Sequence, residues 1–306
     1  MLAAKSQNEK NISEVRSIVL LNPLGPLVIP ASGITSEHIK ADTEIIIQNW
    51  KTVDEVTGLM AAGNTPFVVL PITTAANLNA NGIPLVLLGV HEWKVFYLIA
   101  SQDTAFSDWD SLIGKTLYSP EGKGQTVDTL TRYALINAGV TPDVDVKFVY
   151  APAQEIVALY KEGKVEYAAL PEPFVSLAIA GEKGNIVMDY QKYWSEEKNA
   201  THGIPIAGLF VRRDFYENYP EITEDVVSTF SKSINWANEN PEKAVEASSS
   251  ILTIPENIML SALERMKFEF IPAAKSKQDV LDFLNAMQKT YPEGIKAIPA
   301  DSFFAE

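Results

Sequence analysis

The stretch Glu55-Val-Thr-Gly-Leu-Met-Ala-Ala-Gly-Asn-Thr-Pro-Phe-Val-Val-Leu-Pro71 returns in outline, 100 residues further on, as Glu155-Ile-Val-Ala-Leu-Tyr-Lys-Glu-Gly-Lys-Val-Glu-Tyr-Ala-Ala-Leu-Pro171. Both copies keep the glutamate and leucine of a helical period, the glycine that would end the helix, and a Leu-Pro pair that ends an apolar strand. An apolar strand also precedes each helix, over 44–48 and 146–150. The pattern indicates two related α/β units.

Glycine C-caps and apolar strands are generic, so the same similarity also fits two unrelated α/β units. On the repeat interpretation the fold class is α/β, with two Rossmann-like lobes. In open α/β sheets, ligands bind beyond the carboxyl ends of the strands. The segments that begin at Pro71 and Pro171 should then face one another across a cleft.

The chain is expected to cross between the lobes twice, which implies a two-strand hinge. Residues 97–101 lead out of the first lobe, and the apolar strand 203–211 leads back to it. From residue 214 onward the spacing of apolar residues and prolines predicts helices that pack on the first lobe. We therefore predict a polar tether over 1–16, a discontinuous first lobe over 17–100 and 206–306, and a second lobe over 101–205.

Composition excludes several classes of function. The 306 residues are 46% hydrophobic and carry a net charge of −14, so a globular core is expected and a nucleic-acid partner is not. The absence of cysteine excludes disulfides, iron–sulfur clusters and a thiol nucleophile. The longest apolar run, 83–90, is too short to span a membrane. The first residues lack the features of a signal peptide, so any targeting segment of an exported protein is expected to be absent from this sequence.

Motifs for catalysis or cofactor binding fail when they are tested residue by residue. Gly114-Lys115-Thr116 resembles the end of a phosphate-binding loop, but Trp109 stands where the leading glycine belongs. The three histidines share no metal-ligand spacing, and with no cysteine a zinc site would need ligands from distant parts of the chain. We expect no catalytic residues, no metal and no cofactor.

A stronger chemical signal is the segment Tyr118-Ser-Pro-Glu-Gly-Lys-Gly-Gln-Thr126, where a strand ends in a glycine-flanked turn and a helix begins. Free backbone N–H groups at a helix start attract a carboxylate, sulfonate or phosphate. Thr73 and Thr74 make the corresponding helix start in the first lobe. Ordinary N-capping by a hydroxyl residue would produce the same pattern.

Further candidates lie at predicted strand ends. Trp50 could stack on a ligand or belong to the core or hinge, His91 could contact a ligand or be a hydrogen-bonded structural residue, and Glu172 could accept a ligand N–H or cap the helix that follows it. The predicted ligand-binding residues are Asn22, Gly25, Trp50, Thr73, Thr74, His91, Ser119, Gly124, Gln125, Thr126 and Glu172.

The order of these segments along the chain resembles that in the substrate-binding proteins of ABC importers, in the branch that includes binders of nitrate, sulfonates, taurine and thiamine precursors. The resemblance covers nearly all of 17–290. It is carried by Val68-Val-Leu-Pro-Ile-Thr-Thr-Ala-Ala-Asn-Leu78, Gly114-Lys-Thr-Leu-Tyr-Ser-Pro-Glu-Gly122 and Ala168-Ala-Leu-Pro-Glu-Pro-Phe174. It implies a type II periplasmic binding protein fold whose lobes close on a small molecule by hinge motion.

By this resemblance the chain is expected to be a non-enzymatic, monomeric solute-binding protein outside the cytoplasmic membrane, either periplasmic or lipid-anchored, with ABC permease subunits as partners. The ligand would be a small anion, such as a sulfonate, carboxylate or nitrate, or a thiamine-type pyrimidine. Enzymes related to this family offer an alternative. The pyrimidine synthase of thiamine formation needs a cysteine-rich motif that this chain lacks, and a menaquinone-pathway dehydratase would need an acid/base pair that the sequence does not reveal.

Overall fold

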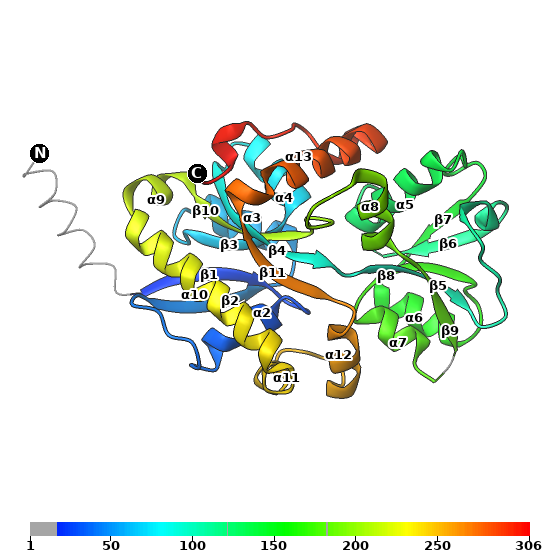
Figure 1. The fold of residues 1–306 in the computed structure, drawn as a ribbon, viewed down its shortest axis with the longest axis horizontal. Coiled ribbons are helices and arrows are strands. Elements are labelled where there is room, and N and C mark those ends of the chain that lie inside the picture. Colours follow the sequence, from blue (N-terminus) through cyan, green and yellow to red (C-terminus); the bar gives the residue numbers. More distant parts are fainter. Residues whose placement is uncertain (1–16, 121, 182) are drawn as a thin grey trace, which may run out of the picture.

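The computed structural model describes residues 17–120, 122–181 and 183–306, and these form two α/β lobes side by side (Figure 1). The predicted tether over 1–16 lies outside the described residues. The first lobe contains a six-stranded sheet of order β11-β4-β10-β3-β1-β2, and the second a five-stranded sheet of order β7-β6-β8-β5-β9. The strands of the first sheet are β1 (Ser17–Pro23), β2 (Glu44–Trp50), β3 (Phe67–Pro71), β4 (Leu85–Lys94), β10 (Ala207–Arg212) and β11 (Lys267–Pro272); those of the second are β5 (Phe96–Ser101), β6 (Thr116–Ser119), β7 (Lys147–Tyr150), β8 (Tyr167–Pro171) and β9 (Gly184–Asp189).

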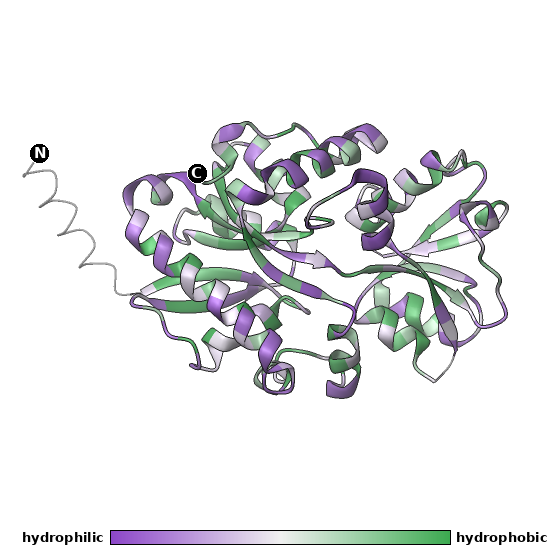
Figure 2. Ribbon diagram, viewed as in Figure 1, coloured by the Kyte–Doolittle hydropathy of each residue, from purple (hydrophilic) through white to green (hydrophobic). Residues whose placement is uncertain are grey.

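Helices pack on both faces of the first sheet, in which β1, β2, β3 and β4 run in one direction and β10 and β11 run in the opposite direction. Figure 2 shows hydrophobic residues concentrated in the strands, with hydrophilic residues on the outer helices. The first lobe contains α2 (Val28–Thr35), α3 (Val53–Ala61), α4 (Ile72–Ala80), α9 (Arg213–Asn218), α10 (Pro220–Glu239), α11 (Pro241–Ser248), α12 (Glu256–Leu263) and α13 (Ala273–Thr290); the second contains α5 (Thr126–Asn137), α6 (Ala153–Lys161), α7 (Phe174–Ile179) and α8 (Tyr190–Lys198).

The repeated sequence folds into the same elements in both lobes. Helix α3 is followed by β3, and helix α6 is followed by β8, each offset by the distance seen in the sequence. Gly63 and Gly163 end the two helices with φ of 80° and 73°, in the left-handed region where a Cβ is unfavourable. The structure therefore contains two copies of one αβ unit.

One strand lies in a different sheet from the prediction. Strand β5 was assigned to the end of the first lobe, but it pairs with β8 and β9 of the second sheet. The first crossing accordingly falls between β4 and β5, at Val95. The apolar run gave no sign of this change, because β4 and β5 are both buried and only one residue separates them.

The two sheets meet at the carboxyl ends of their parallel strands. Strand β5 starts at the crossing, and its first residue, Phe96, pairs with Pro171 at the carboxyl end of β8. Strand β6 is parallel to β8, so Ser119 also ends at this edge. In the first lobe the carboxyl ends of β1, β2, β3 and β4 lie at the edge from which β4 leaves. The predicted cleft is therefore bordered by strand ends from both lobes.

Two segments add to the sequence-based expectation: a strand lies among the helices expected after residue 214, and the stretch 193–202, which gave no helical signal in the sequence, is largely helical. Residues 267–272 form β11, an edge strand antiparallel to β4, and much of the second stretch belongs to α8. The alternation of Phe268 and Phe270 with charged residues is the period of a strand. That signal was present in the sequence but is too short to decide without its partner strand.

Candidate ligand site between the lobes

The carboxyl ends of β1 and β2 hold buried polar atoms without partners. Asn22 pairs in register with Asn49, and Pro23 with Trp50. Asn22 Nδ2 donates to the carbonyls of Pro23 and Leu27, at 3.2 and 3.1 Å, whereas its Oδ1, the Oδ1 of Asn49 and the indole Nε1 of Trp50 have no partner among the described residues. An unsatisfied buried polar atom is costly, so such atoms indicate groups that a ligand or water completes.

His91 and Glu92 lie at the carboxyl end of β4, where the pairing with β10 shifts register. The His91 ring is fully buried and packs edge-on against Phe230 of α10, with centroids 5.2 Å apart. Both of its ring nitrogens lack a partner among the described residues. Burial lowers the pKa of His91 to about 3 and raises the pKa of Glu92 to about 8. At neutral pH both side chains are therefore held uncharged.

In the second lobe, the hydroxyl of Ser119 is buried at the end of β6 and, within the described chain, lacks a partner. Helix α5 begins at Thr126, and its first N–H groups have no acceptor within the helix. Thr73, Gly124 and Thr126 line one cavity of about 10 Å³, room for about one water molecule. The two predicted helix starts thus converge, as expected from the sequence.

The C-terminal segment lies beside these helix starts and contributes several residues to the wall of the cavity. Met287, Tyr291 and Ile295 line the same cavity. Tyr291 lies so close to Gly124 that a Cβ at that glycine would overlap its ring. Gly294 accepts a hydrogen bond from Asn77 of α4 at 2.8 Å, which ties the segment to the first lobe. Sequence reasoning missed these residues, because nothing local to them indicates a contact with a segment more than 160 residues away.

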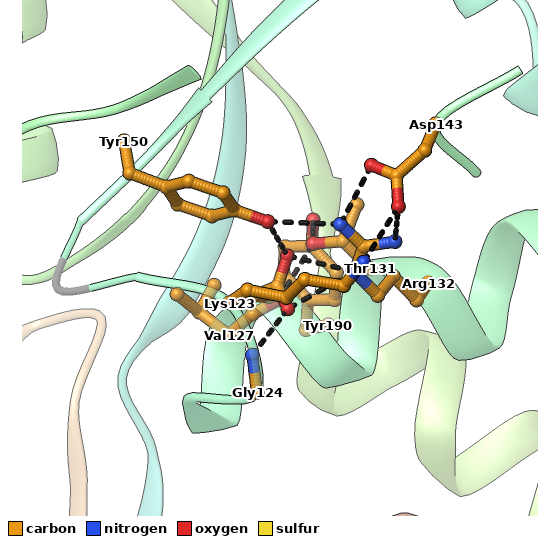
Figure 3. Close-up of polar contacts among 9 residues, drawn as sticks. Lys123, Gly124, Val127, Thr131, Arg132, Asp143, Tyr150 and Tyr190 are labelled. Atoms are coloured by element: carbon orange, nitrogen blue, oxygen red, sulfur yellow. Dashed lines mark hydrogen bonds and ion pairs between the residues drawn. The ribbon is translucent and has the colours of Figure 1, made fainter. Parts of the chain in front are cut away.

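A buried ionic network supports the start of α5 (Figure 3). Arg132 donates through Nε to Asp128, at 3.0 Å, and through Nη1 to Asp143, at 2.8 Å. Tyr150 accepts from Arg132 and donates to Asp128, both at 2.8 Å. Hydrogen bonds from Arg132 are the main cause that lowers the pKa of Asp143, to about 2. The sequence gave one signal for this network, the Asp128–Arg132 spacing of four residues on a helix.

This network changes the chemistry predicted for Gly124. Its N–H donates to Asp128 Oδ2, at 2.8 Å, so the helix start already holds a carboxylate of its own. Gly124 takes φ of 86° and therefore needs to be glycine for the turn. Of the predicted segment, Thr126 is the first residue of α5 and lines the cavity, and its N–H has no acceptor within that helix, while Gln125 is the exposed N-cap residue and makes no side-chain cap hydrogen bond.

Glu172 does not offer a free carboxylate to the cleft. Its side chain accepts from the N–H and the hydroxyl of Ser176, at 2.9 and 2.8 Å, and forms an ion pair with Arg265 Nε at 2.6 Å. Arg265 lies between α12 and β11 of the first lobe, whereas Glu172 belongs to the second. Glu172 thus caps α7, as one alternative held, and joins the two lobes.

Trp50 is also placed differently from the stacking prediction, since its ring is 5% exposed and belongs to the core of the first lobe. Gly25 forms the turn after β1, with φ of 106° and its carbonyl accepting from Val28 N–H. Thr74 lies half-buried in the first turn of α4. Asn22, Trp50, His91 and Ser119 share one property, a buried polar atom at a strand end that has no partner within the described ranges.

Two further observations concern metal binding and membrane crossing. Among the described residues, no three His, Asp or Glu side chains gather in an arrangement that could hold a metal ion. No helix within the described ranges is long and apolar enough to cross a membrane.

The architecture is that of the type II periplasmic binding proteins, two α/β lobes joined at a hinge around a cleft. Residues 58–252 match the model of the NMT1-like family, and the chain belongs to that family. No curated protein sequence matches it.

Three solved structures illustrate the similarity. An ABC transporter protein from Parabacteroides distasonis is 25% identical, with 95% of this chain and 99% of that chain covered and a TM-score of 0.78. The periplasmic aliphatic sulphonate binding protein SsuA from Escherichia coli is 16% identical, over 94% and 95% of the two chains, with a TM-score of 0.73. The periplasmic nitrate-binding protein NrtA from Synechocystis PCC 6803 is 14% identical, over 95% and 91%, with a TM-score of 0.67. Two of these neighbours are named as periplasmic binding proteins, and the third as an ABC transporter.

Proposed function

We propose that this protein is the extracytoplasmic solute-binding component of an ABC importer, and that it captures a small polar solute between its lobes. The observation that carries the proposal is the set of buried, unpartnered polar atoms at Asn22, Trp50, His91 and Ser119, contributed by strand ends of both lobes at the edge where the lobes meet. A solute that supplies the missing hydrogen bonds would stabilise the closed arrangement of the lobes.

The helix starts favour an acceptor group on this solute. Thr73 and Thr126 lie beside one cavity and belong to the first turns of α4 and α5, where N–H groups and the positive ends of the helix dipoles point toward bound oxygen atoms. A sulfonate or carboxylate group meets this requirement. The names of the structural neighbours, which include sulphonate and nitrate binders, agree with it.

A second ligand class has an observation of its own. The free Oδ1 atoms of Asn22 and Asn49 are acceptors, and they require N–H donors on a ligand. A nitrogen heterocycle such as a thiamine-type pyrimidine provides such donors together with ring acceptors for the Trp50 indole N–H. The two ligand classes therefore depend on different contacts: an anion depends on the helix starts, and a nitrogen heterocycle depends on the asparagine oxygens.

A thermal-shift screen of sulfonates, carboxylates, nitrate, bicarbonate, pyrimidines and thiamine tests the proposal, because a bound solute raises the melting temperature in proportion to ln(1 + [L]/Kd). If sulfonates or carboxylates raise the melting temperature and Thr126→Pro abolishes this increase, the result would support binding at the helix starts. Proline is tolerated at this first helical position but removes one N–H donor. If pyrimidines raise the melting temperature and Asn49→Leu abolishes this increase, the result would support a nitrogen heterocycle as the ligand. No response to any member would contradict the proposed ligand classes, and formation of a product would favour an enzyme.

A further inference from the structure

The first lobe contains a pocket that the inter-lobe site does not use. It has a volume of about 380 Å³, within the usual range for small-molecule sites. Its walls come from α2, α10, α11, α12 and β11, and all of its lining residues belong to the first lobe. None of the residues of the small inter-lobe cavity lines it. The pocket is therefore separate from the inter-lobe cavity and is bordered by five elements.

The buried walls of this pocket are apolar. Ile29, Ala237, Met266 and Phe268 form buried walls, and Leu260 is half-buried at the side of α12. One of the two Nδ2 hydrogens of Asn238 is used, since Nδ2 donates to the carbonyl of Phe268 at 2.8 Å. An occupant therefore meets apolar side chains on the buried walls, and the rest of the exposed Asn238 amide lies at their edge.

The charged residues of the lining have one sign. Glu242 and Glu264 are exposed carboxylates at its rim, and none of the described lining residues is a lysine or arginine. The cations that follow Glu264 in the chain are engaged elsewhere, Arg265 with Glu172 at 2.6 Å and Lys267 with Glu269 at 2.8 Å. The net charge of −14 adds a field of the same sign over the whole protein.

We propose that the pocket between α2, α10, α11, α12 and β11 binds a small organic cation, an ammonium group on an aromatic or branched apolar body. The apolar body fills the walls, and the ammonium group lies at the rim between Glu242 and Glu264. The buried Phe268 ring would pack against the apolar body. An anion is disfavoured, because it would meet two carboxylates without a compensating cation.

Calorimetric titration of the full chain at low salt with three probes of similar size tests the charge requirement: benzyltrimethylammonium, benzyl alcohol and benzoate. We expect benzyltrimethylammonium to bind most tightly, benzyl alcohol to bind at least several-fold more weakly, and benzoate not to bind. Raising the salt concentration should weaken the binding of the cation but not that of the alcohol. Equal affinity for the cation and the alcohol, or no binding of the cation at millimolar concentration, would overturn the proposal.

Variants locate the site. Glu242→Gln and Glu264→Gln should each weaken binding of the cation about two- to fivefold, the effect of an exposed ion pair. The control is Glu246→Gln, which changes an exposed carboxylate on α11 outside the pocket and should leave the affinity unchanged. Leu260→Trp should abolish binding by filling the pocket, and Ala237→Leu gives an independent version of this test if the first variant melts early. Unchanged affinity in a folded pocket-filling variant would contradict the site.

The test is independent of the proposed transport function. Thr126→Pro should retain benzyltrimethylammonium binding, and Glu264→Gln should retain the response to the inter-lobe solute. If the cation is lost with Thr126→Pro instead, it binds between the lobes and the separate site is wrong. If no inter-lobe solute is found but the cation binds as described, only the proposed transport function is weakened.

Discussion

Two sets of buried polar groups, one in each lobe, differ in how completely they are hydrogen-bonded, although the lobes share a repeated αβ unit. In the second lobe, Asp128 and Arg132 are almost fully buried, and each has its charge met by hydrogen-bonded partners. In the first lobe, Asn22 and His91 are equally buried, but Asn22 keeps one and His91 two atoms without partners. A completed network holds a surface in one geometry, whereas an incomplete one leaves capacity for a ligand. We therefore regard the second lobe as the preformed surface and the first as the receptive one.

The largest effect should come from breaking the completed network. Arg132→Met leaves the carboxylate of Asp128, whose side chain is 0% exposed, without its cation. Removing one partner of a buried pair costs about 3–5 kcal/mol, so we expect a loss of this size in the free energy of unfolding measured with urea. Lys164→Met, which removes an exposed partner of Glu162, is the control and should cost less than about 1 kcal/mol. Similar losses in both variants would contradict the contrast between the lobes.

In the first lobe, Glu92 should make stability fall as the pH rises. Its pKa is about 8 in the folded chain and 4.5 ordinarily, so between these values unfolding releases a proton. Glu92→Gln removes this penalty. Relative to the wild type, the variant should gain on the order of 2–4 kcal/mol in unfolding free energy on going from pH 4.5 to pH 7.5. A constant difference between the two proteins across this range would show that Glu92 ionises freely.

His91, the neighbour of Glu92, should produce the opposite pH dependence. Its pKa is about 3 in the folded chain and 6.5 ordinarily, so unfolding takes up a proton between these values and stability is lost as the pH falls. His91→Phe removes that loss. Comparison of urea unfolding at pH 7.5 and pH 5.5 should show a relative gain of about 1.4 kcal/mol for the variant, the value of one pH unit. An unchanged slope would mean that a partner stabilises the charged ring.

The smallest effect concerns Ser119, a residue of the second lobe that departs from the contrast. Its hydroxyl is buried and lacks a partner among the described residues, whereas the hydroxyl of Thr131 contacts Val127 O and Tyr190 OH, at 2.7 and 2.6 Å. Ser119→Ala should leave the unfolding free energy unchanged or raise it by up to about 1 kcal/mol, while Thr131→Val should cost about 1–3 kcal/mol. Thermal melts of the two variants test this, and a larger loss for Ser119→Ala would indicate that its hydroxyl is bonded in the folded chain.

Much of the fold could be predicted because its signals are local. The helix periods, the glycines at 63 and 163 and the Leu-Pro strand ends each depend on neighbours along the chain, and all of them form the predicted elements. Strand β11 was missed because an edge strand of six residues carries too short a pattern, and β5 was assigned to the wrong sheet because burial on both faces gives the same apolar run in either lobe.

For the candidate site, only the positions of the residues could be predicted from the sequence. Strand ends and helix starts indicated where Asn22, Thr73, Ser119 and Thr126 would lie, since the topology of an open α/β sheet places them at one edge. Which of their atoms remain free depends on partners from distant parts of the chain. Glu172 illustrates this, because its carboxylate is taken by an arginine 93 positions away.

By itself, then, the sequence determined two related α/β lobes, the edge at which they meet, and a chain without cysteine chemistry. Only the tertiary structure decided which polar groups are satisfied: the network around Arg132, the contact between Tyr291 and Gly124, and the acidic pocket beneath α12. The physical reason is that secondary structure follows from interactions within a few residues, whereas the hydrogen bonding, burial and pKa of a side chain follow from whatever the fold places beside it.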